Sequence, residues 1–344
     1  MNYRSIAQLS DRVLAWSRSL PRDIDLVVGI PRSGLLVANL IAVYRNIPLA
    51  ELDGFLDGRV LATGYTKAGT LSSKGAEGEG ERRFLDVPRK VLVVDDSVGS
   101  GRTLERVRAR IEAAGLSHEV TYGAVYVAPD QEDSVDTYAE VLHFPRAFEW
   151  NVLNHKAIMH RAALDIDGVL CHDPQKSEND DGERYREFIR TARPLFIPDR
   201  KVGWLVTSRL ERYRAETEAW LREHGVTYDE LVMMPYPDRD TRMRMNTYGA
   251  HKAQVYRESG ALLFIESELR QAVEIAELSG KDVLCIDTMQ MVRPGGIPAA
   301  RPAQALAPQN PKGLARRVAH QVLPEPAKSA LRKARRNVRR AARR

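Results

Sequence analysis

Short apolar runs alternate with small-residue turns and amphipathic segments along most of the chain. In the first half, the apolar runs are typical of buried strands and lie at residues 25–30, 90–96 and 121–128. Apolar side chains recur at helical spacing in residues 1–20, 34–45 and 102–115. Because strand, turn and helix follow one another repeatedly, the pattern predicts a parallel sheet with crossover helices.

The same alternation returns in the second half of the chain. Four further apolar runs predict strands at residues 161–166, 201–206, 261–265 and 282–286. From about residue 291 the chain becomes rich in Pro and Ala, which is typical of a linker, and it then ends in a basic segment. The sequence therefore predicts an α/β protein with two Rossmann-like domains and a tail. The predicted parts are residues 1–155, 156–290, 291–311 (the linker) and 312–344 (the tail).

Composition narrows the class of protein. The 344 residues are 43% hydrophobic and 28% charged, which are globular values. Two cysteines, Cys171 and Cys285, exclude a disulfide framework, and the first residues form no apolar leader, so a cytoplasmic location is expected. Residues 312–344 contribute +11 to a net charge of +6, so the rest of the chain carries −5. An acidic body argues against nucleic-acid binding as the main activity.

A phosphate-binding pattern follows the second predicted strand, in residues 91–104, which read VLVVDDSVGSGRTL. Asp95 and Asp96 come at the strand's carboxyl end, where open α/β sheets bind their ligands. Gly99 and Gly101 allow backbone N–H groups to approach an anion, and the start of a helix adds a positive dipole. Carboxylates that accept hydrogen bonds from ribose hydroxyls, next to a phosphate cradle, predict a sugar-phosphate site.

This pattern resembles the signature of the type I phosphoribosyltransferases, which bind phosphoribosyl pyrophosphate (PRPP). The upstream LVVGIPRSG segment is similar to the family's pyrophosphate-binding turn. The resemblance implies a phosphoribosyltransferase fold for residues 1–155 and Mg²⁺ on the leaving pyrophosphate. It implies PRPP-binding roles for Arg32, Ser33, Gly34, Asp95, Asp96, Ser97, Gly99, Ser100, Gly101, Arg102 and Thr103.

Other features of this half bear on the acceptor. The glycine-rich residues 54–85 take the place of the family's catalytic loop, where Lys67 and Lys74 either reach the pyrophosphate or are plain solvated lysines. Gly99 stands where purine-specific members carry an acid, which weakens a purine-salvage interpretation. Residues 144–155 are expected to form a hood over the acceptor, in which Trp150 either stacks on a ring or is buried. The general base stays open, with Asp53 and Asp57 as candidates.

A second acidic pair, Asp165 and Asp167, follows the strand at 161–166 in the segment DIDGVL. In extended backbone these side chains point the same way, so both can serve one reaction centre or, as the alternative, be turn acids. Asp165 is then a candidate nucleophile at phosphorus and Asp167 a candidate acid/base, with Mg²⁺ screening their repulsion.

The pattern over residues 158–290 resembles the haloacid-dehalogenase (HAD) superfamily of phosphatases. The resemblance implies that Thr207 binds the phosphoryl group and that Lys252 neutralises the phosphoaspartate. It also implies a metal site of Asp165, Asp167 and Glu266, with Glu268 as the alternative to Glu266.

Two such sites on one chain predict consecutive steps. The first transfers phosphoribosyl from PRPP, and the second removes the 5-phosphate, as in PRPP-dependent ribofuranosyltransferase systems of bacterial surface polysaccharides, which the chain resembles. The expected acceptor is a hydroxyl of a lipid-linked glycan, and the basic tail is expected to rest on an anionic membrane or to stay in solvent. The alternatives are a nucleobase phosphoribosyltransferase with a nucleotidase, and a PRPP-sensing regulator whose tail contacts nucleic acid. A homodimer is one alternative for the oligomeric state.

Overall fold

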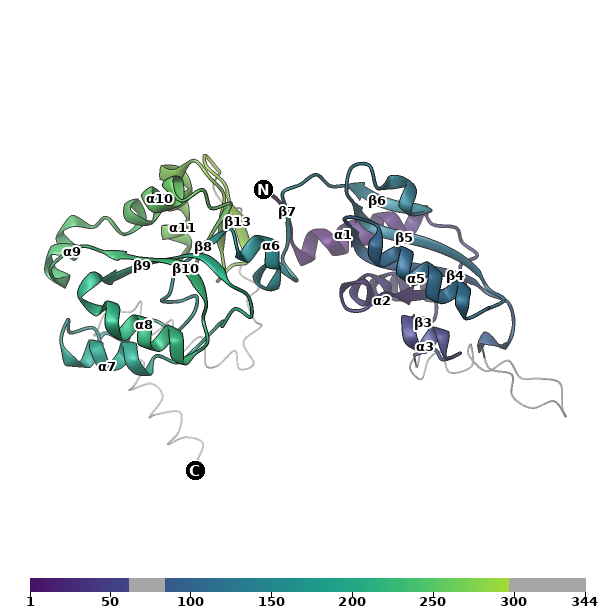
Figure 1. Ribbon diagram of the computed structural model, residues 1–344. Helices are drawn as coiled ribbons and strands as arrows, with labels where there is room; N and C mark the ends of the chain where they lie inside the picture. Colours follow the sequence, from purple (N-terminus) through teal and green to yellow (C-terminus); the bar gives the residue numbers. More distant parts are fainter. Residues whose placement is uncertain (62–83, 297–344) are drawn as a thin grey trace, which may run out of the picture. The chain divides into compact units, whose positions relative to one another are not determined.

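The computed structural model describes residues 1–61 and 84–296 (Figure 1). Lys67, Lys74 and the basic tail at 312–344 lie outside the described residues. Within the described ranges the strands form a five-stranded, a six-stranded and a two-stranded sheet. The α/β class predicted from the sequence is confirmed, with parallel pairing throughout the five-stranded sheet.

The five-stranded sheet has the order β3-β2-β4-β5-β6. Its strands are β2 (Leu26–Gly29), β3 (Leu49–Glu51), β4 (Lys90–Val98), β5 (Glu119–Val127) and β6 (Thr137–Val141). Its helices are α1 (Ile6–Ser19), α2 (Ser33–Arg45), α3 (Leu52–Leu56) and α5 (Arg102–Ala113). The chain builds outward from β2 to β3 and then from β4 to β6, so the strand order reverses between β2 and β4. Ligands of open α/β sheets bind at this kind of reversal.

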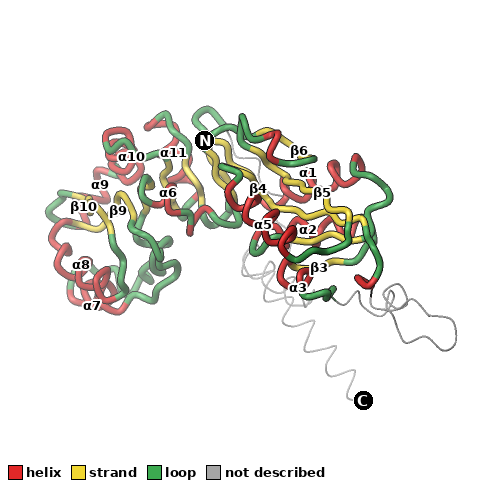
Figure 2. The backbone as a smooth tube through the Cα atoms, turned by 45° about the vertical axis from the view of Figure 1, so that its right-hand side comes forward, coloured by secondary structure: helices red, strands yellow, loops and turns green. Residues whose placement is uncertain are grey.

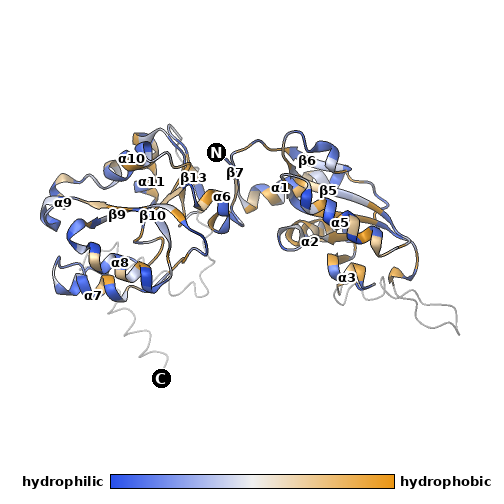
Figure 3. Cartoon of the chain, viewed as in Figure 1, coloured by the Kyte–Doolittle hydropathy of each residue, from blue (hydrophilic) through white to orange (hydrophobic). Residues whose placement is uncertain are grey.

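Alternate residues of β4 pack on opposite faces of the five-stranded sheet. Leu92 and Val94 belong to the apolar cluster that α1 and α2 cover, whereas Val91 and Val93 belong to the cluster that α3 and α5 cover. All four side chains are buried, which explains why β4 is a continuous apolar run. Figure 3 shows α5 with hydrophobic and hydrophilic residues alternating along it, as a helix with one buried face requires.

The six-stranded sheet has the order β10-β9-β8-β11-β12-β13. Its strands are β8 (Ala162–Leu164), β9 (Val202–Leu210), β10 (Tyr228–Met234), β11 (Leu263–Glu266), β12 (Val283–Cys285) and β13 (Gln290–Val292). Only β13 is antiparallel to its neighbour. The strand order reverses between β8 and β11, so this sheet also has a reversal that suits a ligand site.

Helices cover both faces of the six-stranded sheet. They are α7 (Glu183–Thr191), α8 (Arg214–Glu223), α9 (Arg239–Met245), α10 (Tyr248–Glu258) and α11 (Leu269–Ser279). The apolar residues of α7 and α8 belong to one cluster, and those of α10 and α11 belong to another. Figure 2 shows α7 beside α8 and α10 beside α11, in agreement with these clusters.

The first twenty residues depart from the single helix predicted for them. Residues Asn2–Arg4 form β1, which pairs in parallel with β7 (Arg146–Phe148). Helix α1 begins only at Ile6, because Ser5 and Gln8 form a capping box that fixes the helix start. The two-stranded β1–β7 sheet therefore anchors the predicted hood segment to the start of the chain.

Two strands run further than their apolar segments. Strand β4 continues to Val98 because it pairs with β5 as far as Val127, and β9 continues to Leu210 beside β10. Ser97 and Thr207, expected in turns, therefore lie on strands. Strands β3, β6 and β10 lack a continuous apolar run and were not predicted.

The first turn of α2 packs directly against the end of β4 at Gly34. A Cβ atom at this position would lie 2.6 Å from the carbonyl oxygen of Val94 and 3.1 Å from Oδ1 of Asp95. Backbone atoms cannot move aside cheaply, so glycine is required for this close approach. The contact brings Ser33 next to the acidic pair.

We predict that Gly34→Ala lowers the free energy of unfolding by about 1–3 kcal/mol, the usual cost of overpacking. Urea unfolding measures the change. Val43→Ala on the same helix is the control, because Val43 is 70% exposed and its truncation should change stability by less than about 0.5 kcal/mol. Equal stabilities of the two variants would contradict this role of Gly34.

Candidate functional site

The first candidate site begins with the acidic pair at the carboxyl end of β4. Asp96 is only 4% exposed, and two neutral donors hold its carboxylate. Ser33 Oγ donates to Oδ1 at 2.8 Å, and Trp150 Nε1 donates to Oδ2 at 2.7 Å. Asp95 Oδ1 accepts the backbone N–H of Asp96 at 2.8 Å. The structure thus joins the start of α2, the end of β4 and the hood.

The pKa of Asp95 is strongly shifted in this site. Burial, followed by repulsion from the Asp96 carboxylate, raises the pKa of Asp95 to about 8. Near neutral pH Asp95 therefore retains its proton. The oxygens of the two carboxyl groups can accept hydrogen bonds from paired hydroxyls, and an arriving cation would favour ionisation of Asp95.

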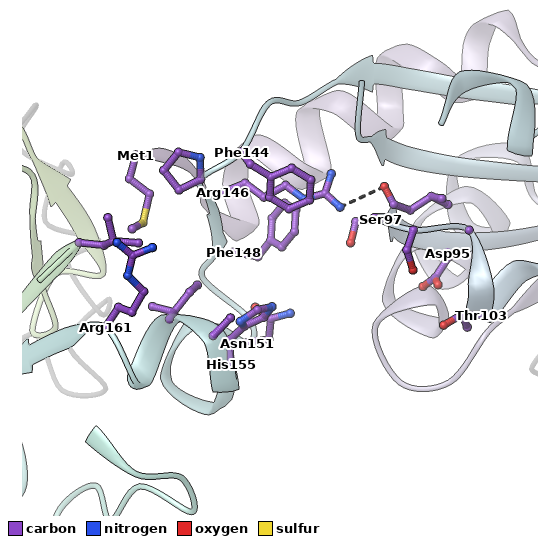
Figure 4. A pocket seen from close by; sticks show the side chains of 18 of the residues that line it. Met1, Asp95, Ser97, Thr103, Phe144, Arg146, Phe148, Asn151, His155 and Arg161 are labelled. Carbon is purple, nitrogen blue, oxygen red and sulfur yellow. Dashed lines mark hydrogen bonds between the residues drawn. The ribbon is translucent and has the colours of Figure 1, made fainter. Parts of the chain in front are cut away.

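The turn after β4 provides an anion cradle. Gly101 is the N-cap of α5 with φ +73°, and no side chain caps the first N–H groups of this twelve-residue helix. Helix N-terminal N–H groups without a side-chain cap are suited to a phosphate. Ser97, Ser100 and Thr103 line a cavity of about 430 Å³ here, together with Asp95 (Figure 4).

The remaining sequence-predicted PRPP residues lie around this cradle. Gly99 and Gly101 line the same cavity, whereas Arg102 is exposed at the start of α5 and is not among the lining residues. Arg32 is exposed and lines a neighbouring cavity with Asn151 and His155. The structure therefore brings most of the predicted set together and leaves both arginines free to reach a ligand from the rim.

The hood contributes aromatic side chains and one cation. Trp150 stacks on Phe148, with ring centroids 4.8 Å apart, and Phe148 stacks in turn on Tyr126. The side chain of Trp150 therefore packs on protein rings and binds Asp96, which is closer to the buried alternative than to a stacking platform for the acceptor. Arg146, which the sequence did not single out, lines the cavity between Phe144 and Phe148 (Figure 4).

The two candidate bases, Asp53 on α3 and Asp57 directly after it, form ion pairs with arginines away from the cavity. Asp53 pairs with Arg110 at 2.6 Å and Asp57 pairs with Arg59 at 2.8 Å, both at the surface. Neither lines the cavity beside Asp95, whereas His155 does. Burial lowers the pKa of His155, so its imidazole is neutral near pH 7 and able to take up a proton.

The second candidate site lies where β8 and β11 end, at the strand-order reversal of the six-stranded sheet. Lys252 Nζ, on α10, donates to Asp165 Oδ2 at 2.6 Å and to Glu266 Oε2 at 2.7 Å. All three residues are at most 5% exposed. A bridged buried triad of this kind needs the cation, because two uncompensated buried carboxylates would repel each other. Lys252 is therefore not a surface lysine.

The burial and contacts of Asp165 and Lys252 determine the protonation states of these two side chains. Burial raises the pKa of Asp165 to about 7, against the opposing attraction of Lys252. Burial also opposes the charge of Lys252, but the Asp165 and Glu266 carboxylates outweigh it and raise the pKa of Lys252 above its usual range. Lys252 therefore stays charged, and Asp165 needs further positive charge to be fully ionised at neutral pH.

Asp167 is held by a residue that the sequence interpretation missed. Arg209, which is fully buried on β9, donates from Nη2 to Asp167 Oδ1 at 2.7 Å and from Nε to Oδ2 at 3.1 Å. A sequence signal existed, because Arg209 follows the fully buried Thr207 by two residues and so shares its face of the strand. The fork fixes the orientation of the Asp167 carboxylate.

The side chains that line the second cavity are mostly acidic and therefore suit a metal cation. Within the described residues the cavity of about 460 Å³ has six acidic and two basic side chains, namely Asp165, Asp167, Asp173, Glu266, Glu268, Asp287, Arg242 and Lys252. Hard oxygen donors in this excess fit Mg²⁺. Among the residues that the structure describes, no group of three or more His, Cys, Asp or Glu side chains is already arranged to hold a metal ion. Arg209 pairs with both oxygens of Asp167, whereas Lys252 takes one oxygen each of Asp165 and Glu266, so these two carboxylates fit a metal better than Asp167 does. Glu268 accepts a hydrogen bond from Gln271.

Comparisons with known proteins address the first site. Residues 2–154 match the family model "Phosphoribosyl transferase domain", so the chain carries an N-terminal phosphoribosyltransferase domain. The match ends at residue 154, before β8 begins.

Two curated relatives are called "Transcriptional regulator GfcR". The protein from Methanothrix thermoacetophila is 33% identical over 100 residues, which are 28% of this chain and 43% of that protein. The protein from Methanococcoides burtonii is 30% identical over 116 residues, which are 33% of this chain and 51% of that protein. The chain thus spans about half the length of these relatives.

Two phosphoribosyltransferases are among the solved structures to which part of this chain is similar. A purine phosphoribosyltransferase from Pyrococcus horikoshii is 22% identical with a TM-score of 0.30, over 43% of this chain and 92% of that one. The xanthine-guanine-hypoxanthine phosphoribosyltransferase of Helicobacter pylori is 12% identical with a TM-score of 0.31, over 44% and 93%.

We predict that Asp95→Asn stabilises the free protein more at pH 8 than at pH 5. The pKa of Asp95 is raised on folding, so folding takes up a proton between about pH 4 and pH 8 and wild-type stability falls as pH rises through that window. The amide removes this loss while its oxygen can still accept the Asp96 N–H. Melting temperatures at the two pH values measure the difference, at about 2–4 °C per kcal/mol.

Asp133→Asn is the control for this prediction, because Asp133 is an exposed acid in the same half of the chain. Its effect on the melting temperature should be small and equal at both pH values. A gain from Asp95→Asn that does not change between pH 5 and pH 8 would refute the raised pKa.

Proposed function

We propose that the chain is a bifunctional enzyme. At the first site it transfers the 5-phosphoribosyl group of PRPP to an acceptor hydroxyl, with pyrophosphate leaving. At the second site, in a HAD-like domain over residues 156–290, it removes the 5-phosphate and leaves ribofuranose. The family match over residues 2–154 supports the first half. The Asp165–Lys252–Glu266 triad at a strand-order reversal is the observation that carries the second half.

In the transferase step, the acidic pair, the cradle and Arg32 each hold one part of PRPP. Asp95 and Asp96 accept the ribose hydroxyls, while the N–H groups at the start of α5 and the hydroxyls of Ser100 and Thr103 hold the 5-phosphate. Arg32 binds the leaving pyrophosphate as a charged donor fork. The bond from the anomeric carbon to pyrophosphate breaks, the acceptor oxygen bonds to that carbon, and the acceptor proton passes to a base.

The phosphatase step uses the second triad. Asp165 attacks phosphorus, the ester bond breaks, and Asp167 gives a proton to the leaving ribose oxygen. Water then hydrolyses the phosphoaspartate and releases inorganic phosphate. Arg209 holds Asp167 as an oriented carboxylate, which suits it to accept a proton from that water, and Thr207 and Lys252 bind the phosphoryl oxygens. Mg²⁺ held by Asp165 and Glu266 would supply the positive charge that keeps Asp165 ionised.

A glycan hydroxyl is the acceptor we favour. The phosphate group is what retains a nucleotide, so removing it would be wasteful in nucleotide salvage. A polysaccharide, in contrast, needs ribofuranose without the phosphate. Gly99 also leaves out the acid expected beside a purine. Regulation by PRPP is the second candidate, because both curated relatives carry the name of a transcriptional regulator. The phosphatase triad favours catalysis over sensing alone.

We predict that Asp165→Asn separates the two steps. The variant keeps the shape of the side chain beside Lys252 but removes the nucleophile, so pyrophosphate release continues and inorganic phosphate release stops. Mass spectrometry of the product should show one retained phosphate. A fully dephosphorylated product from this variant would remove Asp165 from its assigned role.

The double variant Asp95→Asn, Asp96→Asn is the matched control. It removes charged hydrogen-bond acceptors, each worth about 1.5–3 kcal/mol, and should abolish pyrophosphate release from PRPP. Hydrolysis of ribose 5-phosphate at the second site should continue. Unchanged PRPP affinity would argue against the cradle, whatever the outcome at Asp165.

The basic tail is proposed to hold the enzyme at an anionic membrane surface, near a lipid-linked acceptor. Among the described residues, none of the helices has the length and apolar character needed to span a bilayer. We predict that deleting residues 312–344 leaves both reactions intact on soluble substrates and weakens binding to anionic vesicles, most strongly at low salt. Sedimentation with anionic and neutral vesicles measures this, and equal binding with and without the tail would exclude it.

A further inference from the structure

An arginine in the hood lies beside the cradle at the one position where the motif departs from purine-specific relatives. Arg146 Nη2 donates to the carbonyl oxygen of Val98, the last residue of β4, at 3.0 Å. A Cβ atom on Gly99 would lie 3.1 Å from the same nitrogen. The missing side chain at Gly99 therefore leaves room for this guanidinium.

Within the described residues, the direct contacts of the Arg146 guanidinium are to neutral groups, and the Asp96 carboxylate attracts it from a greater distance. Its carbon lies 4.7 Å from the ring centre of Phe144 and 5.7 Å from that of Phe148 (Figure 4). Its hydrogen bonds reach the backbone oxygens of Val98 and Leu142. No carboxylate lies within ion-pair distance of it in the described part of the chain, although arginines of the same fold, such as Arg4 and Arg110, have such partners.

This environment favours an anion. The side chain is half-buried, and burial lowers the pKa of Arg146 against the opposing attraction of the Asp96 carboxylate. A guanidinium presents five N–H donors, and two carbonyl oxygens leave part of this fork unused. The fork matches a carboxylate or a phosphate bidentately, and the buried ring of Phe148 lowers the local polarity on one side of the pair.

A second polar group in the same cavity lacks a partner. Asn151 Oδ1 is buried and has no hydrogen-bond partner within the described structure, and Asn151 lines the cavity together with Arg146. A side-chain amide that lines the same cavity as a cation suits a ligand that carries a hydroxyl as well as an oxyanion. Neither nearby Phe ring can form such hydrogen bonds.

From these contacts we infer that Arg146 selects an acceptor that carries an oxyanion, a carboxylate or a phosphate, close to the hydroxyl that receives ribose. The inference rests on the proposed function for the identity of the cavity as the acceptor site. It adds the chemical class of the acceptor: an acidic sugar or a sugar phosphate, in preference to a neutral sugar. Arg146 is a specificity-determining residue, and it takes no part in bond making.

Calorimetric titration of the full chain tests this with matched probes. Methyl glucuronide and methyl glucoside differ by a carboxylate, and glucose 6-phosphate and glucose differ by a phosphate, so the two pairs separate the sources of the oxyanion. We expect the wild type to bind at least one acidic probe about tenfold or more tightly than its neutral partner. Arg146→Gln should remove this preference while leaving the weaker binding of the neutral probe unchanged.

A substitution that leaves Arg146 in place provides the matched control. Gly99→Asp would put a carboxylate against the guanidinium, and the internal ion pair should compete with the acidic probe. Gly99→Asn adds the same bulk without the charge, so the preference that Gly99→Asp loses beyond Gly99→Asn measures the effect of the internal ion pair alone. A merely structural role of Arg146 predicts that Gly99→Asp and Gly99→Asn behave alike.

The outcomes separate this inference from the proposed function. Equal binding of acidic and neutral probes, absence of binding by both acids at millimolar concentrations, or a preference that survives Arg146→Gln overturns the selection by Arg146. PRPP binding, titrated on the same samples, reports on the cradle independently. Orotate and uracil form a third pair, and pyrophosphate release with orotate alone would keep the role of Arg146 while replacing the glycan by an acidic nucleobase.

Discussion

Buried carboxylates at the carboxyl ends of central parallel strands are the constraint on which both candidate sites depend. Asp96 near the end of β4 and Asp165 after β8 are each about 5% exposed or less, so each must be compensated by groups from other elements. The partners come from α2 and the hood in one sheet and from α10 in the other. Each acid thus fixes the mutual position of the elements that surround it.

The two sheets compensate their acids by different means. Hydroxyl and indole N–H groups bind Asp96, and they add no charge. A lysine bridges Asp165 and Glu266, and an arginine fork binds Asp167. Neutral donors leave a carboxylate able to attract a cationic ligand, whereas fixed cations prepare a site for an incoming phosphoryl group. The chemistry proposed for each sheet agrees with this difference.

Sequence reasoning predicted the parts whose signal is local. Strands β2, β4, β8 and β11 are continuous apolar runs, and the acids at their ends follow directly in the chain. Strands β6 and β10 were missed because they are partly polar, as strands nearer a sheet edge often are.

Partners that are distant in the chain gave no signal. The donors to Asp96 lie 54 and 63 residues away, and Arg209 lies 42 residues from Asp167. Arg146 was overlooked because its importance comes from the empty space at Gly99, which only the three-dimensional structure reveals.

The proton that Asp95 retains near neutral pH has a thermodynamic consequence for ligand binding. A ligand that arrives with a divalent cation favours the fully ionised pair, so below about pH 8 its binding would release a proton to the buffer. The apparent binding enthalpy then includes the ionisation heat of whichever buffer receives that proton. Affinity at this cradle would therefore depend on pH even where every later chemical step does not.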